Sequence, residues 1–382
     1  KMDDSPTIEE PLQMVPGPTQ IISSIRDAYQ VEFGSSDLEP QFPKDYNRIS
    51  KKLGEIIGAK NQDVVIMMGE GMLGLWAGLK SVIYDKSDKT KVTKTLAIST
   101  GVYGTGVGEM AKQCGSEVEF IEFKYDQVVS KHNVKKIVEK INESKPDLVT
   151  MIHCDTPCGT LNGCLKEIGA AIKAANKDAL FYVDFVSSAG GAAVDVDEWQ
   201  IDIGLWGTQK ALSCPPSLSI VSVSNTAWKR IEQRAYAGYD ALLPFKDVVQ
   251  AGGLAPYTFD WNAMLALERA ADALLAEGMG AVVARHRSNA QYCVEQLRHL
   301  GLKIHACNDA AVAPTCVAFH VPSGWTFSEF DAKLRSMGVV LAGSYGSLAD
   351  HVVRIGVMGS QSNREMIDRV IDVLRLALAS GP

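Results

Sequence analysis

"DIGLWGTQKALSCPPSLSIVSVS" (residues 202–224) places one lysine, Lys210, between two apolar runs, 202–206 and 218–224. Short runs rich in β-branched and other apolar residues predict buried β-strands. Five more runs of this kind precede the segment: DVVIMM (63–68), KTLAIS (94–99), EVEFIEF (117–123), DLVTMIH (147–153) and ALFYVD (179–184). Helical periodicity marks most of the intervals between them, as in 71–83 and 134–144. This alternation predicts an α/β domain with a mainly parallel sheet sandwiched by helices.

The pattern changes near residue 258. Two long helical stretches extend to about residue 300. Fewer expected strands follow, with expected helices beside them. The expected strands are LKIHAC (302–307), TCVAFHV (315–321) and GVVLAG (338–343), and the expected helices are 328–337 and 363–379. We therefore expect a smaller α+β C-terminal domain over 258–382, a large domain over 21–257, and a proline-rich N-terminal arm over 1–20.

Composition narrows the classes of partner. The net charge of −7 and the absence of a lysine and arginine cluster argue against binding to nucleic acid or to an anionic membrane surface. No apolar run approaches the roughly 20 residues that cross a bilayer, so we expect a soluble protein. The eight scattered cysteines, without a leader segment before them, predict an intracellular and most simply cytoplasmic protein, with a peroxisome or mitochondrion left open. Cys154, Cys158 and Cys164 lack paired C-x2-C spacing, so no metal site is expected.

Residues that follow the strands are candidates for chemistry, since ligands bind at the carboxyl ends of the strands in open parallel sheets. Gly69-Glu70-Gly71 leads from a strand into a helix, where free N–H groups favour an anion such as phosphate; a simple tight turn is the alternative. Tyr103 lies in a glycine-rich stretch whose spacing does not match G-x-G-x-x-G. A tyrosine at this edge can stack on an aromatic cofactor or be partly buried.

Asp184 and Lys210 end neighbouring strands of the predicted sheet. An aspartate at the end of an apolar strand either caps a helix or pairs with a buried cation. Pyridoxal phosphate requires a lysine for its Schiff base, a carboxylate for its pyridine nitrogen, a helix terminus for its phosphate and an aromatic ring to stack on. Lys210, Asp184, the turn at Gly69-Glu70-Gly71 and Tyr103 match these requirements. We therefore predict that Lys210 is the Schiff-base lysine.

Seven segments carry a wider likeness, and their order in the chain is more specific than any one of them. They are VPGPTQ (15–20), GEGMLGLWAGL (69–79), TGVYGTGVGEMAKQCG (100–115), HCDTPCGTLN (153–162), VDFVSSAGG (183–191), GTQKALSCPPSLS (207–219) and VVRIGVMGS (352–360). Over nearly its whole length the chain resembles the fold-type I aminotransferases of class V, in particular the alanine–glyoxylate and serine–pyruvate enzymes. The resemblance implies a homodimeric, pyridoxal 5′-phosphate-dependent transaminase. Such an enzyme moves an amino group from an alanine- or serine-like donor to pyruvate or glyoxylate by a ping-pong mechanism, through a Lys210 aldimine.

The same resemblance implies a role for each matched residue. Asp184 would hold the pyridine nitrogen, Tyr103 would stack on the ring, and Arg354 would clamp the substrate carboxylate in two-pronged fashion. Tyr257 and Thr258 would reach the phosphate in the partner subunit, so that the active site is shared. The full implied cofactor set is Gly71, Met72, Tyr103, Thr156, Asp184, Val186, Gln209, Lys210, Tyr257 and Thr258.

Several segments are also similar to pyridoxamine–pyruvate aminotransferases, which use free pyridoxamine as the amino donor. Glu70 supports this alternative, because a carboxylate beside the phosphate site repels a phosphate dianion but tolerates an unphosphorylated ligand. That branch carries a second arginine where Tyr345 stands here, so the substrate stays open between the two branches.

Three other classes are less favoured. A NAD-dependent dehydrogenase leaves Lys210 unused and does not fit the glycine spacing. A cysteine desulfurase or another lyase of the same fold needs a reactive cysteine on a mobile loop, whereas Cys307 and Cys316 fall in expected strands. A binding protein without catalysis does not explain the joint presence of Lys210, Asp184 and Arg354.

Overall fold

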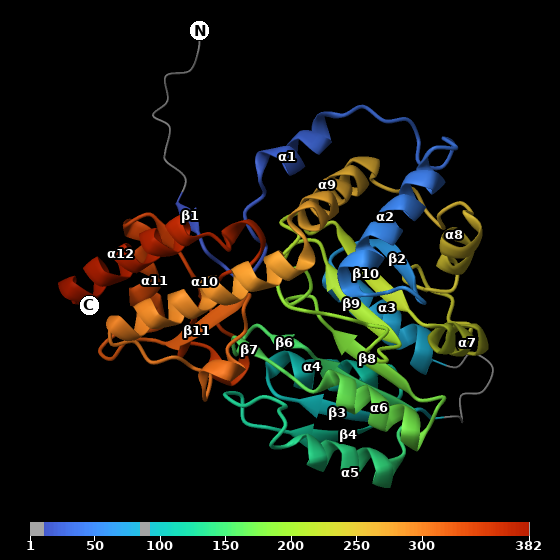
Figure 1. Cartoon of the computed structure of the whole chain (residues 1–382), viewed down its shortest axis with the longest axis horizontal. Helices are drawn as coiled ribbons and strands as arrows, with labels where there is room; N and C mark the ends of the chain where they lie inside the picture. Colours follow the sequence, from blue (N-terminus) through green and yellow to red (C-terminus); the bar gives the residue numbers. More distant parts are fainter. Residues whose placement is uncertain (1–10, 85–91, 382) are drawn as a thin grey trace.

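The computed structural model describes residues 11–84 and 92–381, and the first ten residues of the predicted arm lie outside this range. A seven-stranded sheet dominates the larger part (Figure 1), in the order β2-β10-β9-β8-β5-β3-β4. β10 runs antiparallel to both of its neighbours and the other pairs are parallel, which confirms the predicted mainly parallel α/β sheet. The strands are β2 (Asp63–Met68), β3 (Lys94–Ser99), β4 (Glu117–Glu122), β5 (Leu148–Ile152), β8 (Leu180–Asp184), β9 (Ile203–Gly207) and β10 (Leu218–Val223).

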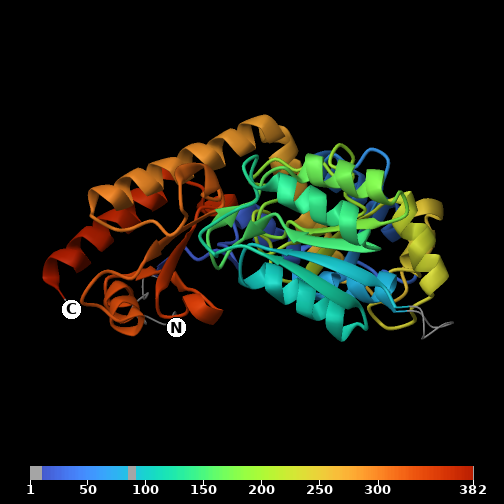
Figure 2. The same cartoon turned by 90° about the horizontal axis from the view of Figure 1, so that it is seen from below.

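Helices cover both faces of this sheet, which explains why its central strands are apolar on both sides. Every residue of β8, β9 and β10 is buried. Figure 2 shows α5 (Val134–Ser144) and α6 (Leu165–Ala175) on one face, and α4 (Val102–Gln113) on the other. The remaining α-helices of this part are α1 (Ser23–Arg26), α2 (Phe42–Ile57), α3 (Gly71–Ile83), α7 (Asn225–Arg234), α8 (Phe245–Ala251) and α9 (Trp261–Glu277).

The smaller part contains the antiparallel sheet β11-β14-β13, with α10, α11 and α12 beside it (Figure 1). Its elements are α10 (Met279–His299), β11 (Cys316–His320), α11 (Phe327–Ser336), β12 (Val339–Val340), β13 (Ala342–Gly343), β14 (Val352–Gly356) and α12 (Arg364–Ser380). β12 pairs in parallel with β1 (Leu12–Gln13), so the described end of the predicted arm is a strand of this part. The sequence analysis did not identify β14.

Two expected strands differ from the structure. Residues 302–307 form no strand, because only one isolated bridge, Ile304 to Phe319, joins them to β11. The expected strand 338–343 is divided at Leu341 into β12 and β13, which pair with different strands. In both places the run lacks continuous ladder partners on a neighbouring strand.

The two hydrophobic cores divide the chain within α10. α9 packs into the core of the large sheet through residues such as Met264, Leu267 and Leu274. The second core begins at Ala290 of α10 and includes Leu12 of β1. We therefore propose a domain boundary inside α10 rather than at residue 258, since helical periodicity alone does not indicate which core a helix faces.

In the part of the chain that the structure describes, no helix is both long enough and apolar enough to cross a lipid bilayer.

Candidate active site

Lys210 lies at the carboxyl end of β9, in the turn that leads back into β10. The turn is held by Thr208, whose Oγ1 donates to the Pro215 carbonyl at 2.6 Å, and by the Ser213 N–H, which donates to the Lys210 carbonyl at 2.9 Å. Burial lowers the pKa of the Lys210 ammonium, and the positive charge of Arg354 lowers it further. The lysine is therefore biased toward the neutral amine, which is the nucleophilic and basic form.

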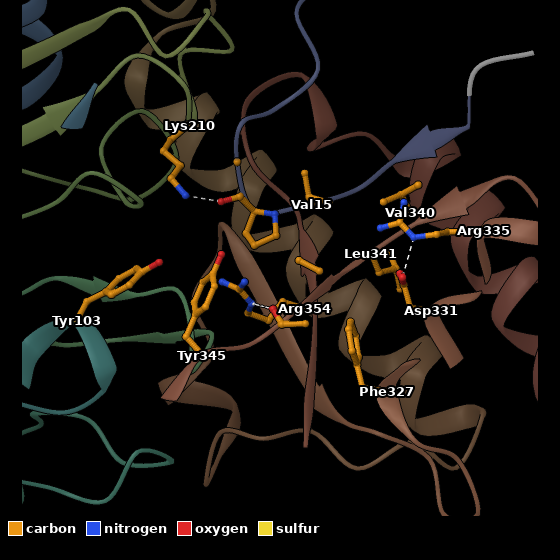
Figure 3. A pocket seen from close by; sticks show the side chains of 14 residues that line it. Val15, Tyr103, Lys210, Phe327, Asp331, Arg335, Val340, Leu341, Tyr345 and Arg354 are labelled. Atoms are coloured by element: carbon orange, nitrogen blue, oxygen red, sulfur yellow. Dashed lines mark hydrogen bonds and ion pairs between the residues drawn. The ribbon is translucent and has the colours of Figure 1, made fainter. Parts of the chain in front are cut away.

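Two cavities meet at Lys210, and Tyr103 lines both of them as well. One cavity, of about 260 Å³, lies at the edge of the large sheet. The other, of about 400 Å³, lies between the large and the small part. Figure 3 shows the second cavity, with Lys210 and Tyr103 toward one end and the Asp331–Arg335 ion pair toward the other.

The cavity at the sheet edge brings together most of the cofactor residues that the sequence suggested. Seven of the ten line it, namely Gly71, Met72, Tyr103, Asp184, Val186, Gln209 and Lys210, and Glu70 lines it as well. Thr156 does not line it, but its Oγ1 lies 3.1 Å from the Oγ of Ser187, which does. Ser187 was not identified from the sequence, although it belongs to the quoted segment VDFVSSAGG.

Asp184 ends β8 and lines this cavity. Its Oδ1 accepts the Val186 N–H at 2.8 Å, and burial raises the pKa of the carboxyl to about 7. A buried carboxylate of this kind gains most from a cationic partner that restores its ionised form. The protonated pyridine nitrogen of pyridoxal phosphate is such a partner.

Tyr103 is positioned by a carboxylate that the sequence analysis did not identify. Asp155 Oδ2 accepts the N–H groups of Tyr103 and Gly104, each at 3.1 Å, and so satisfies the first turn of α4. A Cβ on Gly101 would lie 2.3 Å from the Asp155 Cγ, so this glycine leaves room for the carboxylate. Burial raises the pKa of Asp155 to about 6. The only signal in the sequence was its place in HCDTPCGTLN.

The end of the cavity at α3 combines an anion-favouring backbone with a negative side chain. α3 begins at Gly71, after Gly69 with a φ of +120°, and Glu70 precedes it without capping it. Gln209 Nε2 donates to Glu70 Oε2 at 3.3 Å, while the buried Gln209 Oε1 has no hydrogen-bond partner among the residues that the structure describes. Among the described residues that line this cavity, Lys210 alone is a lysine or arginine. The ring of pyridoxal phosphate therefore fits the cavity well, whereas its phosphate would meet the Glu70 carboxylate.

Arg354 enters the second cavity from β14. Its side chain is buried, and its Nε donates to the Gly343 carbonyl at 2.6 Å. Its guanidinium lies 4.9 Å from the centre of the Tyr345 ring, which in turn lies 6.3 Å from the ring of Tyr103. Because Nε is engaged, the two terminal nitrogens are left to bind a carboxylate in two-pronged fashion.

Tyr257 and Thr258 line neither cavity of their own chain. The Tyr257 hydroxyl accepts the Met68 N–H at 3.2 Å, and the ring stacks on Tyr239 at 4.7 Å. Thr258 Oγ1 donates to Asp37 Oδ2 at 2.6 Å. The structure thus separates these two residues from the rest of the suggested cofactor set.

Comparison with known proteins agrees with this geometry. Residues 16–370 match the family model described as aminotransferase class V. The chain is 30% identical to an uncharacterized aminotransferase of Methanocaldococcus jannaschii, over 93% of this chain and 90% of the relative. It is 30% identical to pyridoxamine–pyruvate transaminase of Mesorhizobium japonicum, over 85% of this chain and 80% of the relative. The solved ureidoglycine–glyoxylate aminotransferase of Bacillus subtilis is 27% identical, with a TM-score of 0.89 over 97% of this chain and 93% of the other. The chain belongs to the class V aminotransferases, which are pyridoxal phosphate-dependent enzymes.

Proposed function

We propose that this aminotransferase exchanges an amino group between a small α-amino acid and a small 2-oxo acid, pyruvate or glyoxylate. The observation that carries the proposal is the place of Lys210, between a cavity that contains Asp184 and a cavity that contains Arg354. A cofactor ring in the first cavity and a substrate carboxylate in the second bring the reacting carbon to the lysine amine. Relatives named for pyruvate or glyoxylate support this choice of acceptor.

Each side chain has a distinct task in this proposal. Asp184 would pair with the pyridine nitrogen, Tyr103 and Val186 would hold the ring, and the N–H groups at Gly71 and Met72 would hold the phosphate end. Bound pyridoxal phosphate would supply an electron sink for the electron pair that is left when the Cα–H bond of the substrate breaks. Lys210 holds the cofactor covalently and accepts the Cα proton on Nζ when its amine is free.

The test is a matrix of donors and acceptors. Alanine, serine, aspartate and pyridoxamine are each paired with pyruvate and with glyoxylate, and product amino acids are quantified by mass spectrometry. Turnover of an α-amino acid with either 2-oxo acid supports the proposal. Failure of every pair, with cofactor bound, would contradict it.

Glu70 favours a second candidate, in which free pyridoxamine is the amino donor. A carboxylate at the start of α3 disfavours a phosphate dianion, and a neutral hydroxymethyl group can donate a hydrogen bond to it. The likeness to a pyridoxamine–pyruvate transaminase points the same way. In the matrix above, turnover of pyridoxamine with pyruvate exceeding that of every amino acid identifies this candidate.

We also propose a homodimer in which each site is completed by the partner subunit. Met72 lines the cofactor cavity yet remains 47% exposed, and Tyr239, which stacks on Tyr257, remains 70% exposed. Large exposed apolar side chains beside a cavity are typical of a surface that another chain covers. Tyr257 and Thr258 would then face the cofactor of the partner subunit, which explains why they line neither cavity of their own chain.

A further inference from the structure

The segment Val15–Gln20 lies between the lysine turn and the small part of the chain. At its start, the Met14 N–H donates to the Val340 carbonyl at 3.0 Å. At its other end, Thr19 Oγ1 donates to the Lys210 carbonyl at 2.8 Å. The segment is therefore fixed from both sides.

Gln361 adds a second clamp from the small part. Its Nε2 donates to the Val15 carbonyl at 2.8 Å, and its Oε1 accepts the Gln20 N–H at 3.0 Å. Gln361 has no exposed surface, so its amide group is held in place by the surrounding protein. The middle of the segment, Pro16 and Gly17, is consequently held between two anchored ends.

Lys210 occupies the space beside this fixed backbone. Its Nζ donates to the Pro16 carbonyl at 2.5 Å. A Cβ on Gly17 would lie 2.5 Å from Lys210 Cδ, 2.8 Å from Nζ and 2.9 Å from Cε, so the lysine fills the place of a side chain at residue 17. Gly17 also has a φ of +95°, in the region that favours glycine.

We propose that the Pro16 carbonyl and the gap at Gly17 form the holding site for the Lys210 amine whenever it is not bonded to the cofactor. A flexible lysine side chain released into a cavity loses its orientation. A hydrogen bond to a fixed carbonyl restores that orientation and engages one N–H donor of the amine. The neutral amine keeps its lone pair, which can still accept the substrate proton. This inference rests on the proposed role of Lys210, and it makes residues 16 and 17 positioning elements that act through that lysine.

The test compares Gly17→Ala with Gly115→Ala. Gly115 has the same φ of +95°, but no atom of the described residues lies within 4 Å of a Cβ placed there, so the pair separates collision with Lys210 from backbone strain. Both variants should load cofactor with unchanged absorbance. The single-turnover reaction with the amino donor should then slow about tenfold in Gly17→Ala relative to Gly115→Ala, the scale of one lost hydrogen bond. Rates of the two variants within twofold of each other overturn the proposal.

A second measurement does not depend on turnover. Protein loaded with pyridoxamine phosphate, in which the lysine is not bonded to cofactor, is acetylated, and the rate at Lys210 is divided by that at the exposed Lys135. We expect this ratio to rise about threefold or more in Gly17→Ala and in Thr19→Val, which adds no bulk, because each releases the amine from its acceptor. The holding site is overturned if the acetylation ratio of Thr19→Val equals that of the wild type and the ratio of Gly17→Ala equals that of Gly115→Ala. If the wild-type protein itself neither fixes cofactor on Lys210 nor turns over, it is the proposed function that fails.

Discussion

Replacement of Arg354 probes the substrate half of the site most sharply. Because Nε donates to the Gly343 carbonyl, only the two terminal nitrogens can hold the substrate carboxylate. Arg354→Gln removes this charge-assisted pair, worth about 1.5–3 kcal/mol, so kcat/KM for a carboxylate substrate should fall roughly 10- to 150-fold. Arg354→Lys keeps the charge but loses the two-pronged guanidinium and the bond to Gly343, so its kcat/KM for a carboxylate substrate should fall by about tenfold. The assay is single-turnover reaction of cofactor-loaded enzyme with alanine and with pyruvate.

The same variant should shift the pH profile in a defined direction. The positive charge of Arg354 lowers the pKa of Lys210, so its removal raises that pKa and leaves less neutral amine at a given pH. The rate with alanine should therefore reach its plateau at higher pH in Arg354→Gln than in the wild type. If pyridoxamine is a donor, its half-reaction, measured on protein without bound cofactor, should lose far less rate in Arg354→Gln than the half-reaction of pyruvate, since pyridoxamine has no carboxylate. Unchanged kcat/KM for pyruvate, with cofactor absorbance intact, would refute the assignment of Arg354.

Three further experiments address the cofactor half. Asp184→Asn should lower turnover about 10- to 150-fold, because an amide does not stabilise a pyridinium as a carboxylate does. In the wild type, the cofactor affinity measured by absorbance titration should decrease as the pH is lowered through about 7, because Asp184 takes up a proton. The Asp184→Asn variant should lose this pH dependence. Glu70→Gln should raise the affinity for pyridoxal phosphate about tenfold and leave that for pyridoxal nearly unchanged; equal changes for both ligands would contradict the charge argument. Lys210→Ala mixed with a Tyr257→Phe, Thr258→Ala double variant should regain activity after verified subunit exchange, whereas no recovery would place both residues outside the partner's site.

The large sheet could be predicted because its strands are buried on both faces. A continuous apolar run such as 180–183 then identifies a strand without reference to its partners. α4 was harder to predict, because its glycines at 104 and 108 resemble a loop. A Cβ on Gly108 would lie 2.4 Å from the Phe120 ring, and one on Gly104 would lie 3.0 Å from the Ser99 Cα. These glycines allow the helix to pack closely on the sheet, which local sequence does not reveal.

Some features of the site could likewise be predicted from the sequence, and others could not. Lys210 and Asp184 could be predicted because each one follows a strand, and the carboxyl ends of neighbouring parallel strands meet at one edge. The cap that Asp155 provides for α4 could not, since it depends on contacts with Tyr103 and Gly104, which lie far from it in the chain. The prolines of residues 11–20 predicted an extended arm, but its place between two cores depends on Gln361, near the other end of the sequence.

The central claim is that Lys210 binds the cofactor covalently at the junction of the two cavities. The direct measurement is reduction of the yellow, cofactor-loaded protein with borohydride, followed by peptide mapping by mass spectrometry. The account predicts loss of the visible absorbance and one modified peptide, with the cofactor mass on Lys210. It also predicts that Lys210→Arg binds cofactor without becoming modified. Modification of a different lysine, or an unmodified Lys210 in protein that has bound cofactor, would contradict the account.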